Sequence, residues 1–157
     1  MLFPGRLRLS AAVIALLLLA TACLGQVPTG TDPSCSWTSD VPGNADSTCR
    51  QVYATLQSIA RAEQRGDTAT IHRLVPVHAV AARIITYGAR LRARSVRDLH
   101  VRASLTLDAL EKPFVGASFD LLGKTRDGRL TAQEVVSLRL QHGQAFVVRD
   151  VPFEDDW

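Results

Sequence analysis

Apolar positions in the first half of the folded part recur every three to four residues, which is typical of amphipathic helices. The first such run predicts a helix that begins near residue 46, with Asp46 or Ser47 as its N-cap, and ends at Gly66. A second, short helix is expected over residues 68–74, and a third over residues 76–94. The pattern therefore predicts three consecutive helices.

From residue 99 onward the period of the pattern changes to two, which is typical of strands with one buried face. It predicts strands over residues 99–108, 114–125, 130–141 and 145–151. Helices followed by consecutive strands favour an α+β fold. We expect N-terminal helices packed on a curved antiparallel sheet of about four strands.

Two glycine-containing turns predict the pairing of the last three strands. With residues 127–128 as a two-residue loop, Phe119 would lie opposite Val136, and Leu121 opposite Glu134. Both pairs fall on the apolar face, as register requires when that face is buried.

The second hairpin, around "QHGQ" (141–144), is expected to pair Leu140 with Ala145 across another two-residue loop. Continued without a break, this register would set Val136 against Arg149. We therefore expect a bulge or a strand end near Arg149.

The N-terminus has the layout of a secretory signal: a basic start without acids and an uncharged, mostly aliphatic run over residues 11–22. Twelve helical residues rise about 18 Å, against about 30 Å for a bilayer core, which disfavours a permanent membrane span. Residues 1–22 are thus a predicted signal peptide. The sequence around the expected cleavage site fits either an ordinary signal-peptidase site of the A-x-A type at Ala20–Ala22 or a bacterial lipobox that ends in Cys23.

The number of cysteines favours lipidation of Cys23. In an exported protein with three cysteines, one is left without a disulfide partner, and lipidation would account for it. Attaching diacylglycerol to Cys23 leaves Cys35 and Cys49 to form a disulfide, worth on the order of 3 kcal/mol for a loop of this size. Two acyl chains suffice for a stable membrane anchor. The alternatives are that Cys23 is a spare thiol of the signal peptide, or that the three cysteines pair differently.

Residues 23–45 are rich in Gly, Pro, Ser, Thr and Asp and are predicted to form the lipidated N-terminus and a spacer. Trp37, within this spacer, either covers one end of the core or is exposed. Residues 46–157 would form the folded domain. We expect the protein at a bacterial cell membrane, anchored by lipid and facing out of the cytoplasm.

The formal charge of +3 includes two arginines of the predicted signal peptide, so the mature chain carries 16 basic against 15 acidic residues. Such a balance is no argument for nucleic acid as a partner.

Two stretches, "ARAEQRGDTATIHRLV" (60–75) and "VVSLRLQHGQAFVVRDV" (135–151), resemble the superfamily of nuclear transport factor 2 and ketosteroid isomerase. They resemble its bacterial lipoprotein members of unknown function more closely. In those, the first helix ends near a Gly-Asp, and the last hairpin has a Gly followed by an aromatic residue, here Gly143 and Phe146, although Trp is commoner than Phe there. The resemblance implies a cone-like domain over residues 46–151 and carries over no catalytic residue.

Enzymes of that superfamily use a carboxylate base inside the cone. Glu134 is the acid that the predicted register places inward, where desolvation would raise its pKa. It would serve an isomerase or dehydratase-like reaction. The alternative is a carboxylate at the sheet rim that reaches water or an arginine.

Five arginines lie within fifteen residues of the third predicted helix and its end, where they could contact anionic lipid headgroups or an acidic partner: Arg83, Arg90, Arg92, Arg94 and Arg97. The alternative is a solvated helix end, where the helix dipole favours cations.

The four histidines show no metal-ligand spacing, and no phosphate-binding loop or nucleophile elbow occurs, so no metal or cofactor is expected. The sequence favours a non-catalytic, lipid-anchored binding or interaction module for a small apolar ligand or a protein partner. The alternatives are an enzyme that uses Glu134 and an assembly accessory that forms a homodimer through its sheet.

Overall fold

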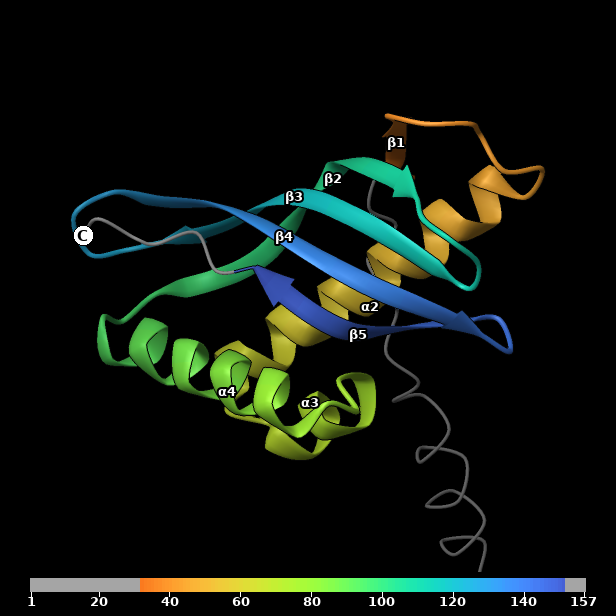
Figure 1. The fold of residues 1–157 in the computed structure, drawn as a ribbon. Coiled ribbons are helices and arrows are strands. Elements are labelled where there is room, and N and C mark those ends of the chain that lie inside the picture. The colour runs from red at the N-terminus through yellow and green to blue at the C-terminus, as the bar shows by residue number, and fades with distance from the viewer. Residues whose placement is uncertain (1–31, 152–157) are drawn as a thin grey trace, which may run out of the picture. The chain divides into compact units, whose positions relative to one another are not determined.

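The computed structural model describes residues 32–151. The predicted signal peptide, Cys23 and the first part of the predicted spacer lie outside these residues. Three helices and five strands make an α+β fold, in which the helices pack against one face of a mixed sheet that does not close on itself (Figure 1). The predicted α+β class, with helices packed on a sheet, is confirmed.

The helices are α2 (Ala45–Arg65), α3 (Thr68–Leu74) and α4 (His78–Ala93). Gly66 ends α2 in the left-handed conformation, with φ at 71°, as its position after the apolar run predicts. The predicted N-cap of α2 is wrong: the helix starts after Asn44, and no side chain caps it.

The Asp67 side chain caps α3 by accepting a hydrogen bond of 3.0 Å from the backbone N–H of Thr70. Helix α4 begins two residues later than expected. A residue before proline is held out of the helical region, and Val75 accordingly has φ −127° and ψ 82°. Val77 is also extended, so the chain turns helical only at His78.

The strands are β1 (Ser34–Trp37), β2 (Arg97–Ala109), β3 (Phe114–Lys124), β4 (Arg129–Gln141) and β5 (Gln144–Val151). They lie in sequence order across the sheet, and every pair is antiparallel except β1 with β2. Four of the five were predicted from the period of two. The expected four-stranded, wholly antiparallel sheet is thus corrected to a mixed sheet of five.

The additional strand, β1, lies in the segment predicted to be a spacer. Its Cys35 is joined to Cys49 of α2 by a disulfide, the pair that the cysteine count predicts. Trp37 is half-buried and packs against the core, so the first of its two predicted settings is correct. The crosslink and the half-buried indole together hold a short, polar segment beside β2.

The register of the β3–β4 hairpin differs from the prediction by two residues. Lys124 pairs with Arg129 around a four-residue loop, in which the Thr125 N–H donates to the Gly128 carbonyl at 3.0 Å. Phe119 therefore lies opposite Glu134, and Leu121 opposite Ala132. A slip of two residues keeps each side chain on its predicted face, because side chains alternate with a period of two.

The β4–β5 hairpin has the predicted register. His142 and Gly143, both with positive φ, form its two-residue loop, and Leu140 pairs with Ala145. The expected bulge is also present: Leu138 pairs with Val147, but Ser137 pairs with Arg149.

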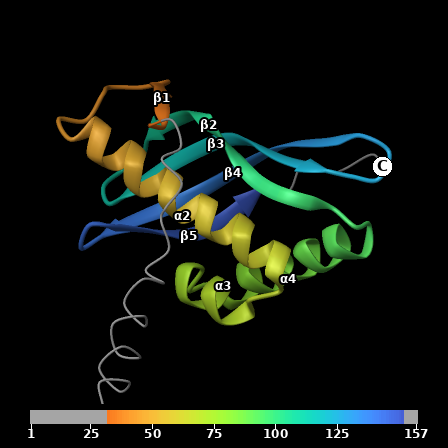
Figure 2. The ribbon, with the colours of Figure 1, turned by 180° about the vertical axis from the view of Figure 1, so that it is seen from behind.

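Helix α2 lies across one face of the sheet (Figure 2). It makes hydrogen bonds to β2 on one side of the helix and to β5 on the other. The buried Thr55 hydroxyl donates to the carbonyl of Ala145 in β5 at 2.9 Å. At β2, the side-chain oxygens of Gln57 and Gln64 accept from the N–H groups of Val101 and Leu99, both at 2.8 Å. These contacts place the apolar face of α2 over the sheet.

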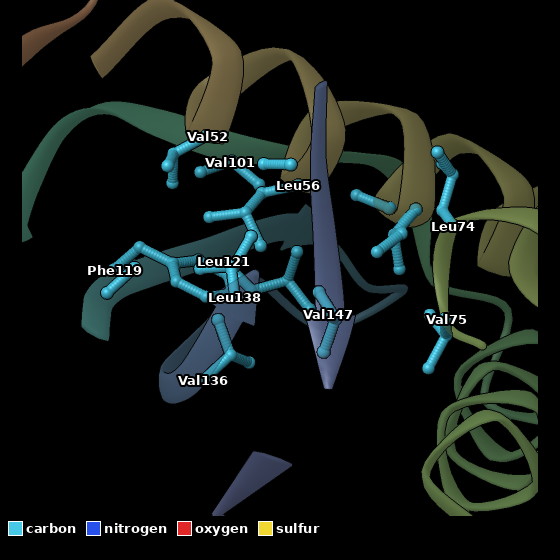
Figure 3. Packing of buried hydrophobic residues seen from close by; sticks show 14 of the residues in the cluster. Val52, Leu56, Leu74, Val75, Val101, Phe119, Leu121, Val136, Leu138 and Val147 are labelled. Atoms are coloured by element: carbon cyan, nitrogen blue, oxygen red, sulfur yellow. The ribbon is translucent and has the colours of Figure 1, made fainter. Parts of the chain in front are cut away.

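The core fills the space between α2 and the inner face of the sheet. Figure 3 shows Val52 and Leu56 of α2 beside Val101 of β2, with Leu121 and Leu138 of β3 and β4 beneath them. All five side chains are buried.

The hydrogen bond between Thr55 and Ala145 can be tested by Thr55→Val, which keeps the shape of the side chain but leaves the buried carbonyl without its donor. We expect a loss of about 1–3 kcal/mol in the free energy of unfolding, measured with urea. Thr86→Val is the matched control, because that exposed hydroxyl donates only to Ala82 in its own helix. An equal, small effect of both substitutions would contradict this role of Thr55.

Candidate functional site

A pocket of about 710 Å³ lies between the helices and the inner face of the sheet. Helices α2 and α4 supply one wall, and strands β3, β4 and β5 supply the other. Most of its lining is apolar: Leu56, Ile59, Ala60, Ile84, Leu91, Phe119, Leu121, Leu130, Val136 and Val147. Acids, arginines, a tyrosine, Ala82 and Thr86 complete the lining, so the pocket combines an apolar body with a few polar groups, as ligand sites commonly do.

Glu63 is the most buried charged residue in this lining, with only 5% of its surface exposed. It lies in the last two turns of α2, on the face that also carries Ile59 and Ala60.

Close contact between α2 and α4 holds the backbone at Glu63 in place. A Cβ added at Gly88 would lie 2.9 Å from the Glu63 Cβ, so only glycine allows this approach. Next to it, the Arg92 guanidinium donates a hydrogen bond to the main-chain carbonyl of Glu63.

Burial raises the pKa of the Glu63 carboxyl well above its ordinary value of 4.5. The charge of Glu134 raises this pKa further, while the Arg92 guanidinium opposes both effects. Glu63 is therefore a protonated, neutral acid over a pH range in which exposed glutamates are ionised.

Sequence reasoning missed Glu63, although the signal was present. The residue falls on the apolar stripe of α2, seven residues after Leu56 and four after Ile59. Glutamate is rarely buried, so an acid in that stripe is a candidate for a paired or functional carboxyl group.

Glu134 lies on the inner face of β4, as predicted, and lines the pocket. It is half-buried, and its opposite neighbour is Phe119 rather than Leu121. Tyr87 and Arg94 of the same lining, like Glu134, each interact with a further group.

The five arginines of the predicted cluster occupy three different settings. Arg83, Arg90 and Arg94 line the pocket, and Arg83 forms an ion pair with Asp150 at the end of β5. Arg92 is held by the Glu63 carbonyl, and Arg97 lies in β2 opposite Lys124.

His72 and His78 lie next to each other despite the proline between them, with parallel rings whose centroids are 5.7 Å apart. Within residues 32–151, no group of three or more His, Cys, Asp or Glu side chains could hold a metal ion. No helix in that part of the chain has the length and apolar character needed to cross a membrane.

Comparison with known proteins gives no family assignment: no protein-family model and no curated protein matches the sequence.

The raised pKa of Glu63 predicts a distinctive pH dependence of stability. Because the folded state holds this proton more tightly than the unfolded state, folding stability falls as the pH rises above 4.5 toward the pKa of the folded protein. Glu63→Gln removes this titration, so the variant should gain stability over wild type as the pH increases. Urea unfolding from pH 4 to 9 measures the difference.

Glu111→Gln is the control for this experiment, since Glu111 is exposed and its substitution should leave the pH profile unchanged. Parallel profiles for Glu63→Gln and wild type would contradict a buried, neutral Glu63.

Proposed function

We propose that this protein is a lipid-anchored, extracytoplasmic binding module whose pocket holds a small, largely apolar molecule. The observation that carries the proposal is the pocket of about 710 Å³, which lies within the size range of small-molecule sites. Its lining provides a continuous apolar surface between α2, α4 and the sheet.

The shape of the domain also supports a ligand site. Helices on one face of a curved, cone-like sheet are what the resemblance to the nuclear transport factor 2 and ketosteroid isomerase superfamily implies. In such a shape the inner face of the sheet curves around the space beneath the helices. Where the side chains of the core do not fill this space, a pocket is left between the sheet and the helices.

The N-terminal sequence supports the location of the module. A basic start, a short apolar run and Cys23 after small residues are typical of a bacterial lipoprotein signal. The Cys35–Cys49 disulfide fits an oxidising compartment outside the cytoplasm.

Binding in the pocket can be tested with the neutral fluorescent probe N-phenylnaphthylamine and the variant Val136→Phe. Val136 lines the pocket, so a larger side chain there should weaken probe binding by about tenfold or more, measured by fluorescence titration. Val135→Phe is the matched control, because this neighbouring residue lies on the opposite face of β4.

Both variants must retain the far-ultraviolet circular dichroism spectrum of the wild type. If the probe does not bind, or if the two substitutions weaken it equally, the pocket is not a ligand site.

The anchor can be tested by metabolic labelling with palmitate in a bacterial host. Wild type should incorporate the label and sediment with membranes, whereas Cys23→Ala should do neither, because it lacks the thiol that accepts diacylglycerol. An unlabelled wild-type protein would contradict the proposed anchor.

A second candidate function is an isomerase or dehydratase-like enzyme with Glu134 as its base. It is supported by the position of Glu134 in the pocket lining, together with Tyr87 and Glu63 as potential proton donors. Turnover of a β,γ-unsaturated ketone to its conjugated isomer, abolished by Glu134→Gln, would distinguish this enzyme from a binding module.

A further inference from the structure

Strand β4 extends beyond the strand beside it. Its pairing with β5 begins at Gln141 and stops at Val135, which lies opposite Val151. Figure 1 shows that β4 continues past the end of β5. Among the strands of residues 32–151, this continuation, residues 129–134, pairs with β3 alone. The backbone along this free edge of β4 (residues 129–134) is a template on which a further strand can form.

The same part of β4 lines the pocket, opposite a row of arginines. Leu130 and Glu134 belong to the lining. From the other side, α4 and its C-cap contribute four residues at the three- and four-residue spacing of one helical face: Arg83, Tyr87, Arg90 and Arg94. All three arginines have exposed side chains. A segment paired with the free edge of β4 would therefore lie close to several cations.

The end of β5 already makes one contact of this kind. Asp150 lies opposite Val136 on the inner face of the sheet, and its carboxylate forms an ion pair with Arg83. Strand side chains alternate between the two faces, so a continued β5 would direct every second residue after Asp150 inward. In the sequence that follows, two of these inward positions are acids, Glu154 and Asp156.

The spacing of the charges fits such a continuation. Along an extended strand, Glu154 would be about 13 Å beyond Asp150. Along a helix, Arg90 is about 10 Å beyond Arg83. The last turn of α4 and the start of β4 line the same pocket, so the row of arginines runs toward the free edge of β4. A second acid–arginine contact, of Glu154 with Arg90, is therefore within reach.

We propose that residues 152–156 form a strap that extends β5 along the free edge of β4 and places Glu154 and Asp156 next to the arginines of α4. The strap crosses the mouth of the pocket, so a ligand enters only when the strap is released. Docking of the strap does not depend on what the pocket binds, whereas its control of entry rests on the proposed function.

Two features make the strap releasable. Ion pairs between exposed side chains contribute little to stability and are screened by salt. Pro152 has no backbone N–H to donate, which is tolerated in an edge strand but gives it fewer hydrogen bonds. The strap is therefore a gate and not a permanent cover.

Hydrogen exchange of the full protein measures the docking directly. Deleting residues 152–157 should speed exchange of the β4 amides that face the strap, within residues 129–134, by about tenfold or more, because they lose their acceptors. Residues 136–141, which pair with β5, should keep their rates. Unchanged exchange over residues 129–134 would overturn the proposal.

Point variants test the charges, with a matched control in the same segment. Glu154→Gln removes an inward acid and should speed exchange over residues 129–134 by about twofold to fivefold, as expected for one exposed ion pair. Asp155→Asn removes an acid of the opposite face and should have no effect. Equal effects of the two substitutions would contradict the proposed pairing.

A charge exchange tests the arginine. Arg90→Glu should speed the same exchange, and adding Glu154→Arg should restore the wild-type rate, because the pair is rebuilt with its signs reversed. No recovery in the double variant would rule out contact between these residues. Circular dichroism establishes that each variant is folded.

Binding of N-phenylnaphthylamine tests the gate. Deleting residues 152–157 should tighten probe binding by about threefold or more, since the closed state no longer competes with the ligand. If the probe binds to neither protein, the proposed function fails, and hydrogen exchange still decides whether the strap docks. If it binds to both equally, the strap does not control entry, and the proposed gate is wrong.

Discussion

The structure depends on one packing constraint, the position of α2 across the sheet. The helix is held to β2 because Gln57 and Gln64 accept hydrogen bonds from its backbone N–H groups, and to β5 because the Thr55 hydroxyl donates to a carbonyl of that strand. The disulfide adds a covalent link from α2 to β1. Because these contacts involve both sides of the sheet, α2 covers its inner face, and the apolar side chains of both layers form one core.

The same constraint creates the pocket. Helix α4 contacts α2 closely at Gly88, where the backbone reaches Glu63. Beyond this contact, the space between the helices and strands β3 to β5 is not filled by side chains, and the pocket occupies it. Glu63 lies in the wall of that space because it continues the apolar stripe of α2. The site is thus a consequence of how two helices meet over a sheet, and its acid is buried by the packing itself.

Features encoded by a few neighbouring residues were predictable. Gly66 ended the first helix and Asp67 capped the second, because a left-handed residue and a capping carboxylate act locally. The β4–β5 register followed from its two-residue loop. The β3–β4 register did not, because a slip of two residues leaves every side chain on the same face, and the apolar pattern cannot distinguish the two pairings.

The sequence by itself determined the helices, four of the strands and their inward faces, and it favoured the Cys35–Cys49 pair and an inward Glu134 over the alternatives. These follow from period, turn residues and residue counts. Only the tertiary structure decided that residues 34–37 join the sheet, that Arg83, Arg90 and Arg94 line a pocket, and that Glu63 is its buried acid. Each of these depends on which distant segments pack together, and desolvation of Glu63 exists only once α4 and the sheet surround it.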